Sequence, residues 1–69
     1  MSISAQNVLK RKVTKLTHGT VDSEVTIRLS NGEKIVSIIT KKSAKDLLLS
    51  KGKEAYAVIK ASNVVIATD

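Results

Sequence analysis

The sequence predicts an all-β fold of five strands, with one short helix between the third and fourth strands. Three observations predict it. Apolar and polar residues mostly alternate along the chain, which is the period of half-buried strands. An Asn-Gly pair joins two of the alternating segments, and a helical spacing of apolar residues follows the third segment. At 69 residues the chain forms a single domain, residues 1–69, with a small core.

The alternation also gives the bounds of the first three strands. Residues 20–30 are the clearest strand, because mainly apolar residues occupy one face and charged or polar residues the other. Residues 8–16 alternate less cleanly, and a β-bulge restores their register. Asn31-Gly32 predicts a two-residue hairpin turn with positive φ at both positions. Residues 33–40 are apolar on both faces, which predicts a strand buried on both sides or curled around a closed barrel.

A short helix and two more strands complete the expected layout. Ser43 is the predicted N-cap, apolar residues at helical spacing follow it, and Gly52 ends the helix. Residues 53–61 and 63–67 are the predicted fourth and fifth strands. This order is that of the five-stranded OB-type barrel, in which closure of the sheet removes exposed edges.

Composition limits the function classes. Twelve basic and six acidic residues give a net charge of +6, which points to an anionic partner. No apolar run approaches the roughly 18 to 20 residues that cross a bilayer, and the first residues lack the pattern of a signal peptide. The absence of cysteine excludes disulfides and is compatible with the cytoplasm. Because small domains often gain stability by association, the sequence also favours a homo-oligomer.

The residues that catalysis uses are few and scattered. His18 is the only histidine, and we interpret it as a solvated residue of a turn. Asp22 and Glu24 share a strand face and could in principle form a carboxylate pair for acid–base work, but we interpret them as part of a solvated strand face. No nucleotide-binding or nucleophile motif occurs. The sequence therefore predicts a protein that is not an enzyme, with no cofactor and no metal held by direct coordination.

Two classes of anion fit the basic charge. Basic clusters at residues 10–15 and 41–45 suit a phosphate backbone, and OB-type barrels often bind RNA or single-stranded DNA. A solvated basic face that keeps the protein soluble explains each cluster at least as well. Such surfaces stack bases on aromatic rings, however, and Tyr56 is the only aromatic residue. Nucleic acid is therefore kept as the alternative partner.

A compact dianion is the other class, and it needs only hydrogen-bond donors. Two polar segments supply them. Residues 4–7 precede the first strand and carry hydroxyl, amide and main-chain donors. Residues 60–62 lie between the fourth and fifth predicted strands and carry an ammonium, a free N–H and a hydroxyl. Taken alone, short segments of this kind are more often simple turns.

These two segments belong to a longer pattern. It begins with Ser4-Ala5-Gln6-Asn7, which is similar to a Ser-Ala-Arg-Asn motif, and continues with His18-Gly19-Thr20-Val21 and Ser23-Glu24-Val25. It runs on through Ile35–Thr40, Ser43, Leu47 and Gly52, and closes with Val58-Ile59-Lys60-Ala61-Ser62-Asn63-Val64. In order and spacing, over essentially all 69 residues, the chain resembles the molbindins, the small Mop-type molybdate-binding proteins of the Mop/TOBE domain family.

The resemblance implies an OB-like barrel that assembles as a hexamer, a trimer of dimers, and stores molybdate, or tungstate, at its subunit interfaces. It implies a first class of oxyanion site made of Ser4, Ala5, Gln6, Asn7, Lys60, Ala61 and Ser62. It implies a second class made of Thr20, Val21, Ser37 and Ile38. The family motif has arginine where this chain has Gln6, so Lys60 is expected to carry most of the positive charge of a weakened first site.

Overall fold

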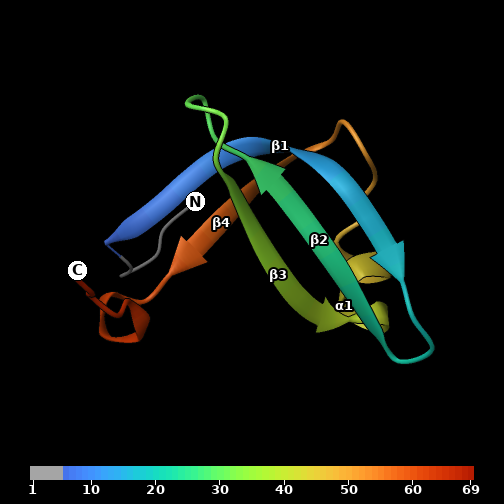
Figure 1. Ribbon diagram of the computed structural model, residues 1–69. Helices are drawn as coiled ribbons and strands as arrows, with labels where there is room; N and C mark the ends of the chain where they lie inside the picture. The colour runs from blue at the N-terminus through green and yellow to red at the C-terminus, as the bar shows by residue number, and fades with distance from the viewer. Residues whose placement is uncertain (1–5) are drawn as a thin grey trace.

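The computed structural model describes residues 6–69 and shows one antiparallel sheet of four strands, in the order β3-β2-β1-β4, with a short helix at one end (Figure 1). The elements are β1 (Asn7–His18), β2 (Asp22–Arg28), β3 (Lys34–Thr40), α1 (Lys41–Asp46), β4 (Glu54–Ile59) and the 3-10 helix η1 (Ala61–Asn63). The predicted all-β class is confirmed, as is the helix between the third and fourth strands. The same residues include no helix with the length and apolarity that a membrane span requires.

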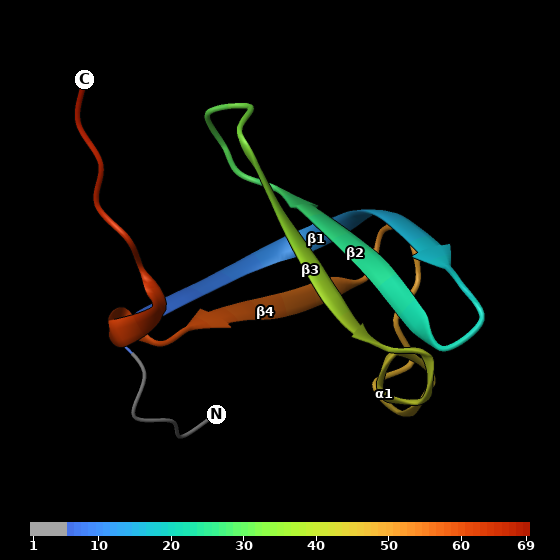
Figure 2. The same ribbon diagram turned by 60° about the horizontal axis from the view of Figure 1, so that its bottom comes forward.

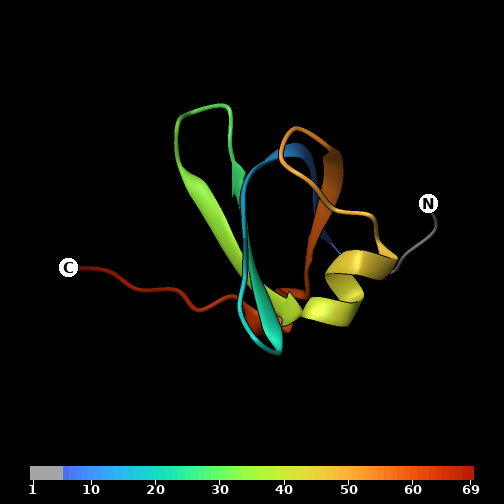
Figure 3. The same cartoon turned by 90° about the vertical axis from the view of Figure 1, so that its right-hand side faces the viewer.

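The first strand bends, and this bend curls the sheet. Its first half, residues 7–12, pairs with β4, and its second half pairs with β2. The register with β2 shifts between Val13 and Lys15, so the predicted bulge is confirmed. Val13 lies at the corner with 1% of its surface exposed, and its N–H and carbonyl bond to Lys53 O (2.9 Å) and Gly52 N–H (2.8 Å). The single strand thereby joins two halves of a curled sheet, which Figure 3 shows end on.

The turn between β2 and β3 differs from the predicted two-residue turn. Its loop has three residues, since the Gly32 N–H donates to Leu29 O at 3.0 Å and the Leu29 N–H donates to Glu33 O at 2.6 Å. Gly32 has a φ of 91°, whereas Asn31 is not among the residues with positive φ. The Asn31 side chain accepts from the Glu33 N–H at 3.0 Å instead. Asn-Gly marked the hairpin correctly, but only its glycine adopts the left-handed conformation.

The helix begins earlier than predicted. Thr40, not Ser43, is the N-cap, because the Thr40 hydroxyl accepts from the Ser43 N–H at 3.0 Å. Ala44, 1% exposed, is the residue that α1 buries against the sheet, whereas Leu47 and Leu48 are 60% and 73% exposed. The Lys53 ammonium donates to the carbonyls of these two leucines, at 2.8 and 3.1 Å, and so closes the carboxyl end of the helix.

The predicted fifth strand is wrong for the single chain. After β4 the chain forms η1, and residues 64–69 have no regular structure. Val64, Val65 and Ile66 are 48%, 88% and 83% exposed, and Figure 2 shows this tail running away from the sheet. The apolar pattern is present, but the tail lacks a neighbouring strand with which to pair. The barrel is therefore open between β3 and β4, and the five-stranded closure is not formed within residues 6–69.

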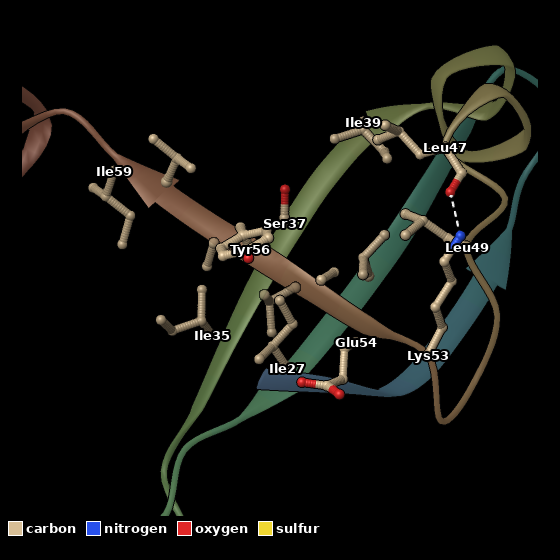
Figure 4. A pocket seen from close by; sticks show the side chains of 15 residues that line it. Ile27, Ile35, Ser37, Ile39, Leu47, Leu49, Lys53, Glu54, Tyr56 and Ile59 are labelled. Carbon is tan, nitrogen blue, oxygen red and sulfur yellow. Dashed lines mark hydrogen bonds between the residues drawn. The ribbon is translucent and has the colours of Figure 1, made fainter. Parts of the chain in front are cut away.

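An apolar hollow of about 720 Å³ lies on the concave side, between β3 and β4 (Figure 4). Its apolar lining comes from β2, β3, the segment after α1, and β4. The third strand was predicted to be buried on both sides or curled around a closed barrel. Ile35 and Ile39 are half-buried in the hollow, but Val36 and Ile38 are 50% and 61% exposed in the single chain.

Gly32→Ala is expected to lower the free energy of unfolding by about 1 kcal/mol, because an L side chain at this positive φ is strained. A Cβ at Gly32 meets nothing within 4 Å, so backbone strain alone accounts for the loss. Chemical denaturation at fixed protein concentration measures it. Ser30→Ala, in the same exposed loop, is the control and should change little. Equal stabilities of the two variants would contradict the assignment of Gly32 to the left-handed position.

Candidate functional site

The start of β1 and the end of β4 lie side by side, and they bring together two segments far apart in the sequence. Asn7 pairs with Ile59 in the ladder, so Gln6 and Lys60 come next on the two neighbouring strands. Figure 1 shows this corner, where the blue start of β1 meets the orange end of β4. The structure thus joins Gln6 and Asn7 with residues 60–62 of the predicted first class. Ser4 and Ala5 of that class lie outside the described residues.

The segment Lys60–Ser62 presents donors to solvent. Lys60 leaves β4 in an extended conformation, and η1 then turns so that the Asn63 N–H bonds to Lys60 O (2.9 Å) and the Val64 N–H to Ala61 O (3.2 Å). Within residues 6–69, the N–H groups of Ala61 and Ser62 have no acceptor. Together with the exposed Ser62 hydroxyl and Lys60 ammonium they make a compact set of donors, which is what an oxyanion requires.

Among the described residues of this corner, Lys60 is the one that carries a formal charge. The ion pairs of the described part of the chain are Lys10–Glu54 at 3.8 Å and Lys42–Asp46 at 2.9 Å, and neither involves Lys60. Gln6 stands where the resemblance expects arginine, so it adds amide donors but no charge. The corner therefore offers one positive charge and several neutral donors.

The four residues of the predicted second class are not assembled within one chain. Ser37 pairs with Val25, whereas the Val21 carbonyl lies four residues further along and accepts from the Lys41 N–H at 2.7 Å. Four residues of strand span about 13 Å. Ser37 lines the hollow (Figure 4), and Ile38, its neighbour in the strand, is 61% exposed. One anion can contact both parts of this class only if different chains supply them. The two parts are Thr20 with Val21, and Ser37 with Ile38.

His18 has a role that the sequence analysis missed. It is the last residue of β1, and its Nδ1 lies 2.6 Å from the hydroxyl of Ser23, which is 1% exposed. His18 is exposed, as the interpretation as a solvated residue expected, but it ends a strand rather than lying in a turn. The signal was Ser23 itself, a polar residue on the apolar face of its strand, because a buried hydroxyl needs a partner. Residues 6–69 hold no group of three His, Cys, Asp or Glu side chains suited to a metal ion.

Comparison with known proteins identifies the family of this chain. The model of the TOBE domain matches residues 3–66. The chain belongs to the TOBE domain family. Molybdenum-pterin-binding protein 3 of Clostridium pasteurianum is 46% identical over 66 residues, which cover 96% of this chain and 97% of the relative. The resemblance to the Mop-type proteins is thereby confirmed.

Two solved structures share the fold of this TOBE domain. MopII from Clostridium pasteurianum, in an apo form, superposes with a TM-score of 0.90 at 43% identity, over 97% of this chain and 100% of that one. The cytoplasmic molybdate-binding protein ModG, with molybdate bound, superposes with a TM-score of 0.88 at 43% identity. That match covers 94% of this chain and 46% of ModG. The relatives are thus binding proteins by name.

His18→Ala is expected to lower the free energy of unfolding by about 1–3 kcal/mol, because it leaves the buried Ser23 hydroxyl without its partner. In a Ser23→Ala background the same substitution should cost much less, since no buried hydroxyl is left unpaired. Denaturation of the four chains in this double-mutant cycle measures the difference. Equal costs in both backgrounds would show that the 2.6 Å contact contributes nothing to stability.

Proposed function

We propose that this chain binds molybdate and stores it in the cytoplasm, as a non-enzymatic homo-oligomer of a single Mop-type domain, residues 1–69. The observation that carries the proposal is the likeness to Mop proteins over nearly the full length of the chain. ModG, described as cytoplasmic and solved with molybdate bound, supports both the ligand and the location. Hydrogen-bond donors do not distinguish tungstate, which has nearly the same size and charge, so tungstate is a second ligand. No cofactor is required.

The corner between β1 and β4 supplies the first-class site. Four oxygens of the dianion accept from the Lys60 ammonium, the N–H groups of Ala61 and Ser62, the Ser62 hydroxyl, and the amides of Gln6 and Asn7. Ser4 and Ala5 complete the set from the same segment as Gln6. One cation among neutral donors holds a dianion and still lets it leave, whereas several cations would hinder its release. Thr20, Val21, Ser37 and Ile38 make the second class between chains.

Oligomerisation completes the barrel in this proposal. The edges of β3 and β4 are unpaired on either side of the hollow, and exposed edges of this kind are sites of strand addition. The exposed apolar tail, residues 63–67, has the sequence of a strand, and Figure 2 shows it directed away from its own sheet. The tail of a second copy fits between β3 and β4 and pairs both edges. Exchange of tails gives a five-stranded barrel in a dimer, and three dimers give the hexamer.

Nothing in the site favours the nucleic-acid alternative. The single aromatic ring, Tyr56, lies under the Lys10 ammonium, 5.7 Å from the ring centroid. The Lys10 ammonium is also 3.8 Å from the Glu54 carboxylate. Base stacking on Tyr56 would have to displace this contact.

Protein exposed to molybdate and then desalted is expected to retain molybdenum, which elemental analysis measures. Lys60→Ala should weaken binding about tenfold or more, because it replaces the only charge-assisted donor of the corner. Lys12→Ala, at an exposed position of β1 away from the corner, removes the same charge and should have little effect. Equal losses in the two variants would place the site elsewhere, and no retention by the native chain would refute storage.

The native mass in solution should be near that of six chains, and removal of residues 64–69 should abolish the association that depends on exchanged tails. Light scattering coupled to size-exclusion chromatography measures both. A chain that lacks only Thr68 and Asp69 keeps Val64–Ile66 and is the control, with an unchanged mass expected. A monomeric native chain, or a shortened chain of native mass, would contradict the exchange.

A further inference from the structure

The turn that ends α1 holds a leucine in a backbone conformation that favours glycine. Leu48 has a φ of 56°, and within residues 6–69 it is the one residue other than glycine with a positive φ. The Leu48 N–H donates to Lys45 O at 3.0 Å, and the next N–H, of Leu49, donates to Ala44 O at 3.1 Å. These two bonds make a Schellman motif, in which Leu48 takes the position after the C-cap. Glycine is common there because it avoids the strain that a side chain brings.

The Leu48 side chain makes no contribution to the core that offsets this strain. In a Schellman motif the apolar contact with the helix comes from the following residue, here Leu49, which lines the hollow. Leu47 lines the hollow too, whereas Leu48 is not part of its lining and is 73% exposed. Strain and exposure therefore both disfavour leucine at position 48 in the folding of the chain. A backbone outlier of this kind points to a role outside folding.

Positive charge is concentrated around this leucine. Residues 41–53 hold five lysines and one aspartate, so they carry +4 of the chain's net charge of +6. The Lys53 ammonium is held at the carbonyl of Leu48, 3.1 Å away. We call the exposed leucine and the lysines of α1 and the following turn the Leu48 patch: Leu48, Lys41, Lys42, Lys45 and Lys51.

Most charges of the Leu48 patch are not neutralised by acids. Among the described residues, Lys42 is the lysine of the patch with an ion pair, to Asp46 at 2.9 Å. Lys45 and Lys51 lie three residues before and after Leu48, and both are exposed. The ion pairs of residues 6–69 include neither of them. An exposed apolar side chain thus stands between two unpaired cations.

The Leu48 patch is separate from the regions that the proposed function uses. Figures 2 and 3 show α1 and the turn after it at the end of the molecule away from the tail. The corner with Lys60 lies beside the tail, since η1 joins them. Exchange of tails and binding of an anion at the corner therefore leave the patch free.

We propose that the Leu48 patch binds the surface of a membrane that contains anionic lipids. Clustered lysines are attracted to the negative potential of such a surface. The exposed Leu48 then enters the boundary between head groups and acyl chains, as the apolar side chains of interfacial helices do. The contact goes beyond the proposed function and does not depend on molybdate.

The combination of charge and leucine favours a lipid surface over other anionic partners. A nucleic-acid backbone attracts lysines, but it offers no apolar layer for Leu48, and this end of the chain has no aromatic ring for base stacking. Protein interfaces are depleted in lysine, whose flexible stem suits a diffuse layer of charge better than a fixed pocket. An anionic bilayer uses both features, since its apolar layer lies directly beneath its charges.

Co-sedimentation with lipid vesicles tests the charge of the patch. The native chain is expected to sediment with vesicles of equal parts phosphatidylglycerol and phosphatidylcholine, and to stay in solution with phosphatidylcholine alone. Lys45→Glu with Lys51→Glu should weaken binding about tenfold or more. Arg28→Glu with Lys34→Glu is the matched control, because it makes the same change in net charge at exposed residues about 20 Å of strand away from α1. It should retain most of the binding.

Leu48→Gly tests the leucine and separates binding from folding. It relieves the strain at a positive φ, so it should raise the denaturant concentration at the unfolding midpoint. It also removes the apolar side chain, so it should weaken vesicle binding about tenfold. Leu48→Met keeps an apolar side chain of similar size and should bind like the native chain. A gain in stability together with a loss of binding is a result that a merely structural leucine would not give.

Several results would overturn the contact. They are a native chain that ignores anionic vesicles, equal losses in the two charge-reversed variants, and native binding or lower stability in Leu48→Gly. Binding to single-stranded oligothymidylate that is stronger than binding to the vesicles would assign the lysines to nucleic acid instead. Circular dichroism checks each fold, and Lys51→Glu alone replaces the double variant if that unfolds. Molybdate retention is measured separately, so its absence from the native chain would refute the proposed function and leave this contact standing.

Discussion

The bend of β1 at Val13 is the constraint on which the other features of this domain depend. Because one strand pairs with β4 before the bulge and with β2 after it, the sheet must curl. The curl creates the concave side and the hollow, and it leaves β3 and β4 as edges that face each other. It also sets the start of β1 beside the end of β4, which brings Gln6 next to Lys60. The corner with Gln6 and Lys60 and the gap between β3 and β4 thus both result from the bend of β1.

The same curl explains why a single chain leaves much of its apolar surface exposed. Among residues 6–69 the buried apolar side chains are Val13, Val25, Ile27 and Ala44, whereas the apolar residues of the tail and several of β3 and β4 are exposed. A chain of 69 residues buries only about 60% of its unfolded surface even when fully folded. With no disulfide to compensate, the remaining apolar surface is available to stabilise an assembly. The proposed association therefore follows from chain length and curl together.

The sequence predicted those elements of the fold that depend on interactions between residues close together in the chain. Alternation located four strands and exposed the bulge, because the side-chain period is a property of each strand. The N-cap is Thr40 and not Ser43, because the Thr40 hydroxyl accepts from the Ser43 N–H. Both residues are good N-caps and lie three positions apart, so the sequence does not distinguish them. The predicted fifth strand was wrong for a different reason. Its residues have the pattern of a strand, but residues 64–69 pair with no strand among the described residues. The contact of His18 was missed because its partner Ser23 is five residues away across a turn.

In the candidate site, too, the part that depends on interactions within one chain was predictable from the sequence. Register alone brings Gln6 and Asn7 beside Lys60, so the meeting of these three residues of the predicted first class follows directly from the pairing of β1 with β4. One chain does not assemble the predicted second class, because Val21 and Ser37 lie about four residues apart in the ladder. In the proposed assembly Lys60–Ser62 immediately precedes the tail that one copy gives to the next. An anion bound there stabilises the position of that tail, and the exchanged tail in turn fixes the donors around the anion. Ligand binding and association are then linked by mass action, and each strengthens the other by the same free energy.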